Sequence, residues 1–174
     1  SFYLKLMKKL IEQKKVASRF EDARIGLDIW SKDMYQLGLG KKLNIDLPSE
    51  SKGLIPTTSY YDRWIGKNEW AYSNFRSVSI GQGEVLMTPL QMANLSALIA
   101  NRGYFYRPHL IRPLKDTLTK YKTGIDTSLF RPVIDGMQWV VEAGTARRAI
   151  TKGITICGKT GTVENGKGED HSVF

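Results

Sequence analysis

The sequence has few of the residues that form covalent or metal cross-links. It contains one cysteine, Cys157, and two histidines among 174 residues. A single cysteine excludes an intramolecular disulfide, and so few sulfur and imidazole ligands argue against a structural zinc site. No apolar run approaches the roughly 20 residues that a membrane-spanning helix needs. With 41% hydrophobic and 25% charged residues, the composition is that of a globular chain long enough to bury a core.

Acidic residues are scarce relative to basic ones. Lys and Arg number 26 against 17 Asp and Glu, which gives a formal net charge of +9. Such a charge suits a nucleic acid, an anionic membrane surface or a polyanionic wall. The densest basic stretch lies within residues 5–15, on the polar side of an expected helix, and we interpret it as a solvated face. Because zinc-finger spacing and RNA-binding aromatic motifs are missing, we expect no nucleic-acid partner.

The spacing of apolar residues predicts four helices, at residues 2–15, 20–37, 89–100 and 127–142. Gly38 and Gly103 follow the second and third, as is typical of helix C-termini. Thr88 is the expected N-cap of the third helix, and Pro89 takes its first position. Because apolar residues lie nearly all round this helix, we expect it to be buried.

Extended segments are predicted at residues 44–48, 78–80, 104–114 and 154–163. Asn165–Gly168 is typical of a hairpin turn, with Phe174 on the returning strand. Residues 49–77 show no clear period, and long loops of this kind are often functional. The aromatic side chains of this loop can line a groove or pin the loop to the core, and both readings stay open. They are Tyr60, Tyr61, Trp64, Trp70, Tyr72 and Phe75.

The segment Lys159-Thr160-Gly161-Thr162 carries groups that can bind a carboxylate. Lys-Thr-Gly on a strand is one signature of penicillin-recognising serine acyltransferases and β-lactamases. Gly161 lets a substrate backbone lie close to the strand, and Thr160 and Thr162 point the same way. Their hydroxyls can hold a substrate carboxylate, while Lys159 supplies a positive charge and a path for protons.

The same region offers an alternative function. Gly153–Thr160 satisfies the phosphate-loop pattern G-x-x-x-x-G-K-[ST]. A nucleotide-binding module built on it would require a helix directly after Thr160 and would bind ATP or GTP with magnesium. The glycines at 161, 166 and 168 oppose such a helix, so we rank this reading second.

Two further patterns are interpreted as structural. Ser49-Glu50-Ser51-Lys52 formally matches the nucleophile motif S-x-x-K, which works when the serine opens a helix. Neighbouring prolines and a glycine predict a turn there instead. Cys157 lies in an apolar run and is expected to be a buried small hydrophobe rather than a nucleophile.

Several short blocks occur in a fixed order along nearly the whole chain. They are Leu37–Gly40, Ile45–Glu50, Gly81–Gly83, Thr88–Ala93, Ile99–Gly103, Pro108–Leu110, Val141–Ala146 and Gly158–Thr162. Together they strongly resemble the transpeptidase domain of class B penicillin-binding proteins. The Gly-Gln-Gly form of the third block looks most like the elongation-type enzymes of that family.

The resemblance implies an α+β fold of the serine β-lactamase type. Its helical subdomain would comprise residues 2–40 and 84–145, packed on part of an antiparallel sheet edged by residues 154–163. It also implies a D,D-transpeptidase that cross-links peptidoglycan stem peptides ending in D-Ala-D-Ala by serine acyl transfer and is trapped by β-lactams. Lys159 would assist proton transfer, and Lys159, Thr160, Gly161 and Thr162 would bind substrate. No cofactor or metal is expected.

The resemblance also sets expectations for the complete protein. In the family the S-x-x-K and S-x-N motifs precede this region, so residues 1–174 are expected to be a fragment of one transpeptidase domain. The fragment would also lack the C-terminal strands and be inactive alone, and dimerisation would be a way to cover its open sheet. The parent would lie on the periplasmic side of the bacterial inner membrane, anchored by an N-terminal span and working with cell-elongation membrane proteins. A non-catalytic wall-binding domain is a third reading.

Overall fold

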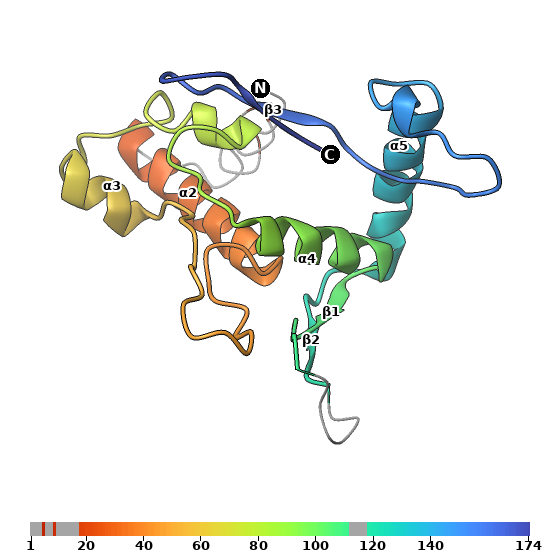
Figure 1. Cartoon of the computed structure of the whole chain (residues 1–174). Coiled ribbons are helices and arrows are strands. Elements are labelled where there is room, and N and C mark those ends of the chain that lie inside the picture. Colours follow the sequence, from red (N-terminus) through yellow and green to blue (C-terminus); the bar gives the residue numbers. More distant parts are fainter. Residues whose placement is uncertain (1–4, 6–8, 10–17, 112–117) are drawn as a thin grey trace. The chain divides into compact units, whose positions relative to one another are not determined.

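The computed structural model describes Lys5, Lys9 and residues 18–111 and 118–174 (Figure 1). The helix predicted over residues 2–15 falls almost entirely outside this part of the chain. The chain divides into two compact units, Ser1–Leu95 with Arg107–Asp116 and Ser96–Tyr106 with Thr117–Phe174. Among the described residues, none of the helices is both long enough and apolar enough to span a membrane.

The first unit is organised around helix α2 (Arg19–Gln36). Ser18 caps the helix, because its hydroxyl accepts from the backbone N–H of Phe20, and acidic residues in the first turn complement the helix dipole. Gly38, with a φ of 86°, ends the helix in the left-handed conformation that glycine adopts without strain. The predicted helix at residues 20–37 is therefore confirmed, together with the predicted stop at Gly38.

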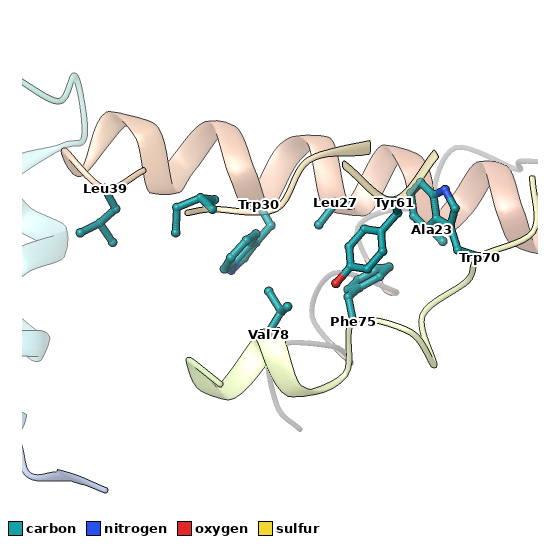
Figure 2. Packing of buried hydrophobic residues seen from close by; sticks show 9 residues of the cluster. Ala23, Leu27, Trp30, Leu39, Tyr61, Trp70, Phe75 and Val78 are labelled. Atoms are coloured by element: carbon teal, nitrogen blue, oxygen red, sulfur yellow. The ribbon is translucent and has the colours of Figure 1, made fainter. Parts of the chain in front are cut away.

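The aromatic residues of the long loop pin it to α2. The loop contains a short helix, α3 (Thr58–Trp64), and its Tyr61, Trp70 and Phe75 are each 1% exposed. These rings pack in one cluster with α2 residues that include Leu27 (Figure 2). Burial of the rings stabilises a segment that has little regular structure of its own. Of the two readings left open, the structure supports the core for these rings and for Tyr60 and Tyr72, which pack against them, whereas Trp64 is 69% exposed.

An ion pair joins α2 to this loop. The guanidinium of Arg24 on α2 donates to both carboxylate oxygens of Asp62, with Nη2 at 2.9 Å from Oδ2. The indole Nε1 of Trp70 donates to Oδ1 of the same carboxylate at 2.9 Å. These bonds, that of Arg24 first, hold the pKa of Asp62 below its ordinary value because they favour the charged form. A single carboxylate thus accepts from both the Arg24 guanidinium and the Trp70 indole at the border of the aromatic cluster.

Helix α4 (Pro89–Ala100) starts with a reciprocal cap. The Thr88 hydroxyl accepts from the backbone N–H of Gln91 at 3.2 Å, and Gln91 Oε1 accepts from that of Thr88 at 3.0 Å. The Nε2 of the same glutamine, which is 1% exposed, donates to the carbonyls of Lys41 and Lys52 at 2.9 and 3.0 Å. Through these bonds Gln91 holds the segments at Lys41 and Lys52 against the start of α4.

The burial of α4 differs from the prediction. Gln91, Asn94 and Leu98 are its buried residues, whereas Ala93, Ala97 and Ala100 are exposed. Counting alanine as apolar suggested an all-round apolar surface, but a methyl group is small and its exposure costs little. The face that packs therefore includes two amides that the apolar pattern did not select.

The carboxylate of Asp46 holds the Pro108–Ile111 segment of the same unit. It accepts from the backbone N–H of Leu110 at 2.8 Å and from that of Ile111 at 2.7 Å. The bonds from Ile111 and Leu110, in that order, lower the pKa of this carboxyl below its ordinary value of 3.8. This link joins two blocks that lie far apart in the sequence.

We expect the two amides bonded to Asp46 to lose their protection in acid. Because the folded-state pKa is depressed, the contribution of Asp46 is fully present above the unfolded pKa and disappears as the pH falls through the folded one. Amide exchange or NMR shifts of Leu110 and Ile111, followed from about pH 6 to about pH 2, measure this step. Asp46→Asn should show no such step, and an identical acid response in both proteins would contradict the assignment.

The second unit contains helix α5 and two small sheets. Strand β1 (Tyr104–Tyr106) pairs antiparallel with β2 (Lys120–Lys122), and β3 (Gly161–Val163) pairs antiparallel with β4 (His171–Val173). Between them lie the 3-10 turns η2 (Thr127–Leu129) and η3 (Arg147–Ala149) and helix α5 (Phe130–Glu142). The predicted helix at 127–142, the hairpin after β3 and the α+β class are confirmed.

The predicted extended segments are wrong or too long as strands. Ser77–Ile80 forms the 3-10 turn η1, and of residues 104–114 only Tyr104–Tyr106 is a strand. Residues 44–48, expected to be a short extended piece that ends in a turn, form no strand and lead through bends at 46 and 47 into a turn at 48 and 49. Of residues 154–163 only Gly161–Val163 is a strand, preceded by an isolated bridge between Thr151 and Ile154. A strand exists only where a neighbour supplies ladder hydrogen bonds. In the part of the chain that the structure describes, residues 155–160 have no such neighbour, so the predicted single sheet is observed as two separate pairs.

Candidate active site

The third residue of the Lys159–Thr162 segment, Gly161, is the first residue of strand β3. Gly161 and Thr162 belong to β3, where they face Val173 and Ser172 of β4 in the antiparallel register. Lys159 and Thr160 precede the strand. A Cβ on Gly161 would lie 3.0 Å from Val173 Cγ2, so the bare glycine keeps the hairpin closely packed at this point.

A side chain from outside the motif contacts it. The hydroxyl of Thr145 lies 2.8 Å from that of Thr160, a hydrogen bond across 15 residues of sequence. Thr145 follows α5, and the backbone turns there because Gly144 has no side chain: a Cβ would lie 2.8 Å from Val140 Cα. Sequence reasoning assigned Thr145 to a matching block but gave it no role. The sequence signal that could have pointed to Thr145 is its position in a Gly-Thr pair directly after a predicted helix.

The two threonines of the motif and Thr145 line one surface hollow of about 530 Å³. The remaining lining residues come from the β3–β4 hairpin and its end: Gly161, Ser172, Val173 and Phe174. Thr160 and Thr162 thus border the same space, as their two-residue spacing predicts. A hollow lined by both hydroxyl and apolar side chains can bind a carboxylate with a small apolar substituent.

Phe174 packs against Gly158. A Cβ on Gly158 would overlap the ring of Phe174, so a larger residue there would require this exposed side chain to shift. Gly158 is buried, and its backbone N–H donates to the Met137 carbonyl of α5 at 3.1 Å. The residue before Lys159 is therefore bonded to α5 and contacted by Phe174, which directly follows β4.

Lys159 is exposed and does not line the hollow. Its Nζ donates to the carbonyl oxygen of Thr160 at 2.6 Å. The structure therefore brings Thr160, Gly161 and Thr162 together, and leaves the lysine ammonium at the edge of this group. Within residues 18–111 and 118–174, no three His, Cys, Asp or Glu side chains are grouped so that they could hold a metal ion.

The other sequence patterns form no second site. Strand β3 and a glycine-rich turn follow Thr160 where the phosphate-loop reading requires a helix, so the nucleotide-binding alternative lacks its structural basis. Ser49 lies in a turn, as predicted, and Glu50 accepts from the backbone N–H groups of Leu43 and Ile45. Cys157 is exposed, which corrects the prediction that it is buried. Its apolar neighbours also lie largely on the surface, since no strand covers them in the described residues.

Comparison with known proteins agrees with this geometry. The family model of the penicillin binding protein transpeptidase domain matches residues 7–173. The chain is 35% identical over 152 residues to the peptidoglycan D,D-transpeptidase MrdA of Acinetobacter baumannii, covering 81% of this chain and 22% of that protein.

Solved structures show the same fold. The crystal structure of Pseudomonas aeruginosa PBP2 superposes with a TM-score of 0.71 at 29% identity, covering 88% of this chain and 36% of that one. PBP2 of Helicobacter pylori, solved in a complex with MreC, gives a TM-score of 0.74 at 25% identity, over 98% of this chain and 30% of that one. The chain thus spans less than two fifths of each of these relatives. It belongs to the penicillin-binding protein transpeptidase domain family.

Proposed function

We propose that this chain forms the substrate-carboxylate site of a peptidoglycan D,D-transpeptidase. The observation that supports this most directly is the shared hollow, which Thr160 and Thr162 line on either side of Gly161 in the sequence. Two hydroxyl donors at this spacing fit the two oxygens of a terminal carboxylate. The bare backbone at Gly161 leaves room for the adjacent peptide.

The reaction is a two-step acyl transfer. A serine hydroxyl adds to the carbonyl between the last two D-Ala residues of a stem peptide, the C–N bond breaks, and the terminal D-Ala leaves with the serine proton. An amine of a neighbouring stem peptide then attacks the ester, which forms the cross-link and frees the serine. The single S-x-x-K in this sequence, at Ser49, lies in a turn, so we assign the attacking serine to another part of the protein.

In this mechanism the residues of the chain bind and orient but do not attack. Thr160 and Thr162 hold the carboxylate of the terminal D-Ala, and the Lys159 ammonium adds positive charge and assists proton transfer. β-Lactams carry a similarly placed carboxylate and therefore occupy the same hollow. We further propose that the protein acts on the periplasmic side of the inner membrane, beside membrane proteins of cell elongation.

Covalent labelling with a fluorescent penicillin tests this function. We expect the full-length protein to form an adduct that survives denaturing electrophoresis. The 174-residue chain alone is expected to form none, because positioning without a nucleophile gives no covalent step. Full-length protein denatured before labelling is the control for non-specific reaction. A stable adduct on the isolated chain, or none on the full-length protein, would refute the proposal.

A further inference from the structure

Thr145 adds a third threonine hydroxyl to the hollow, and it comes from a different element than the motif. Its Oγ1 lies 2.8 Å from Thr160 Oγ1, within the range of a good O–H···O hydrogen bond. Both residues line the same hollow as Thr162. A residue that bonds to a substrate-binding hydroxyl without belonging to the motif is a candidate for orienting it.

The backbone around Thr145 is held on both sides. The N–H of Ala143 donates to the Trp139 carbonyl at 2.9 Å, and that of Ala146 donates to the Val140 carbonyl at 3.0 Å. Ala146 is only 7% exposed, so the chain is anchored directly after Thr145. The hydroxyl is therefore presented from a braced turn at the end of α5 rather than from a free loop.

The number of protons decides the direction of this hydrogen bond when a substrate is bound. Each threonine hydroxyl has one proton to donate and two lone pairs to accept. An ionised carboxylate can only accept, so Thr160 must use its proton on the carboxylate. The bond between the two threonines then persists only with Thr145 as the donor and Thr160 as the acceptor.

We propose that Thr145 is a positioning residue for the transpeptidase: it donates to Thr160 and so directs the Thr160 proton toward the substrate carboxylate. The inference rests on the proposed function, because it assumes that Thr160 binds a carboxylate. Donation from Thr145 also polarises the Thr160 hydroxyl, which makes it a better donor. Without Thr145 the Thr160 hydroxyl rotates freely and loses part of its binding to the carboxylate.

The test compares Thr145→Val and Thr145→Ser in the full-length protein. Valine has nearly the shape of threonine without the hydroxyl, whereas serine keeps the hydroxyl. The measured quantity is the second-order rate constant of acylation by benzylpenicillin and by its methyl ester, which has no free carboxylate. We expect Thr145→Val to slow acylation by the acid about 3- to 10-fold, the loss of one hydrogen bond. The ester should be affected less than about 2-fold, and Thr145→Ser should restore the acid rate to within about 2-fold of wild type.

The same experiment separates the possible failures. A wild-type protein that neither compound acylates would refute the proposed function itself. An acylated wild type with an unchanged acid rate in Thr145→Val would refute the role of Thr145 alone. An equal loss for acid and ester would show a general structural effect and would also overturn it.

A second measurement covers the case in which Thr145→Val disturbs folding. In a Thr160→Val background, which has no hydroxyl to orient, Thr145→Val is expected to cause no further loss of acid rate. Additive losses in the double variant would overturn the inference.

Discussion

Replacing Lys159 by alanine in the full-length protein is expected to slow acylation by penicillin about 100-fold or more, the effect of losing a positioned proton-transfer group. The Lys159 ammonium already lies against the motif, where its Nζ donates to the Thr160 carbonyl at 2.6 Å. Loss of the side chain removes both a positive charge beside the carboxylate site and the group assigned to proton transfer. Because Lys159 is exposed, the substitution is not expected to lower stability measurably.

Lys167→Ala is the matched control for this experiment. Lys167 is also exposed and lies in the turn of the β3–β4 hairpin, so the substitution makes the same change in net charge on the same hairpin. Its acylation rate should stay within about 2-fold of wild type, since it removes only a solvent-screened charge. The rate constants are measured by stopped-flow or by gel labelling at several penicillin concentrations. Equal losses in the two variants would mean that net charge, and not the position of Lys159, decides the rate.

Replacing Trp70 by alanine is expected to lower the free energy of unfolding by about 3–5 kcal/mol, as for other buried aromatic residues. Trp70 is 1% exposed and contacts Tyr61 and Phe75, with ring centroids at 5.3 and 6.1 Å. The substitution leaves a cavity in the cluster that holds the loop to α2. It also removes the indole N–H that donates to Asp62.

Trp64→Ala serves as the control because it removes the same side chain from the same loop. Trp64 is 69% exposed, so the expected cost stays below about 1 kcal/mol. Urea unfolding followed by circular dichroism at 222 nm measures both variants of the 174-residue chain, because tryptophan fluorescence itself changes with either substitution. Similar destabilisation in the two variants would contradict the assignment of Trp70 to the core and of Trp64 to the surface.

Helices were predictable from the sequence because their signals are local. The apolar spacing of α2 and α5 lies within each helix, and the caps Ser18 and Thr88 directly precede α2 and α4. Hydrogen bonds in a helix join residues four apart, so a short window of sequence contains all the partners. The Asn165–Gly168 turn was predictable for the same reason.

Strands and burial were less predictable because they depend on distant partners. The apolar run before Lys159 has the composition of a strand, but it does not pair with β4. Only the residues after it, Gly161–Val163, form that pairing. Cys157 was placed in the core by its apolar neighbours, but it is exposed. Gln91 is polar and still buried, since the carbonyls of Lys41 and Lys52 satisfy its amide.

The sequence alone determined the ordered blocks and the residues of the candidate site, Lys159–Thr162, because a motif is a matter of residue types at a spacing. Only the tertiary structure decided that the loop aromatics form a core and that Thr145 bonds to Thr160 across 15 residues. Both depend on which distant segments lie together. Which segments lie together depends on how much apolar surface the whole fold buries and on which polar groups it satisfies. A local sequence pattern carries no information on either.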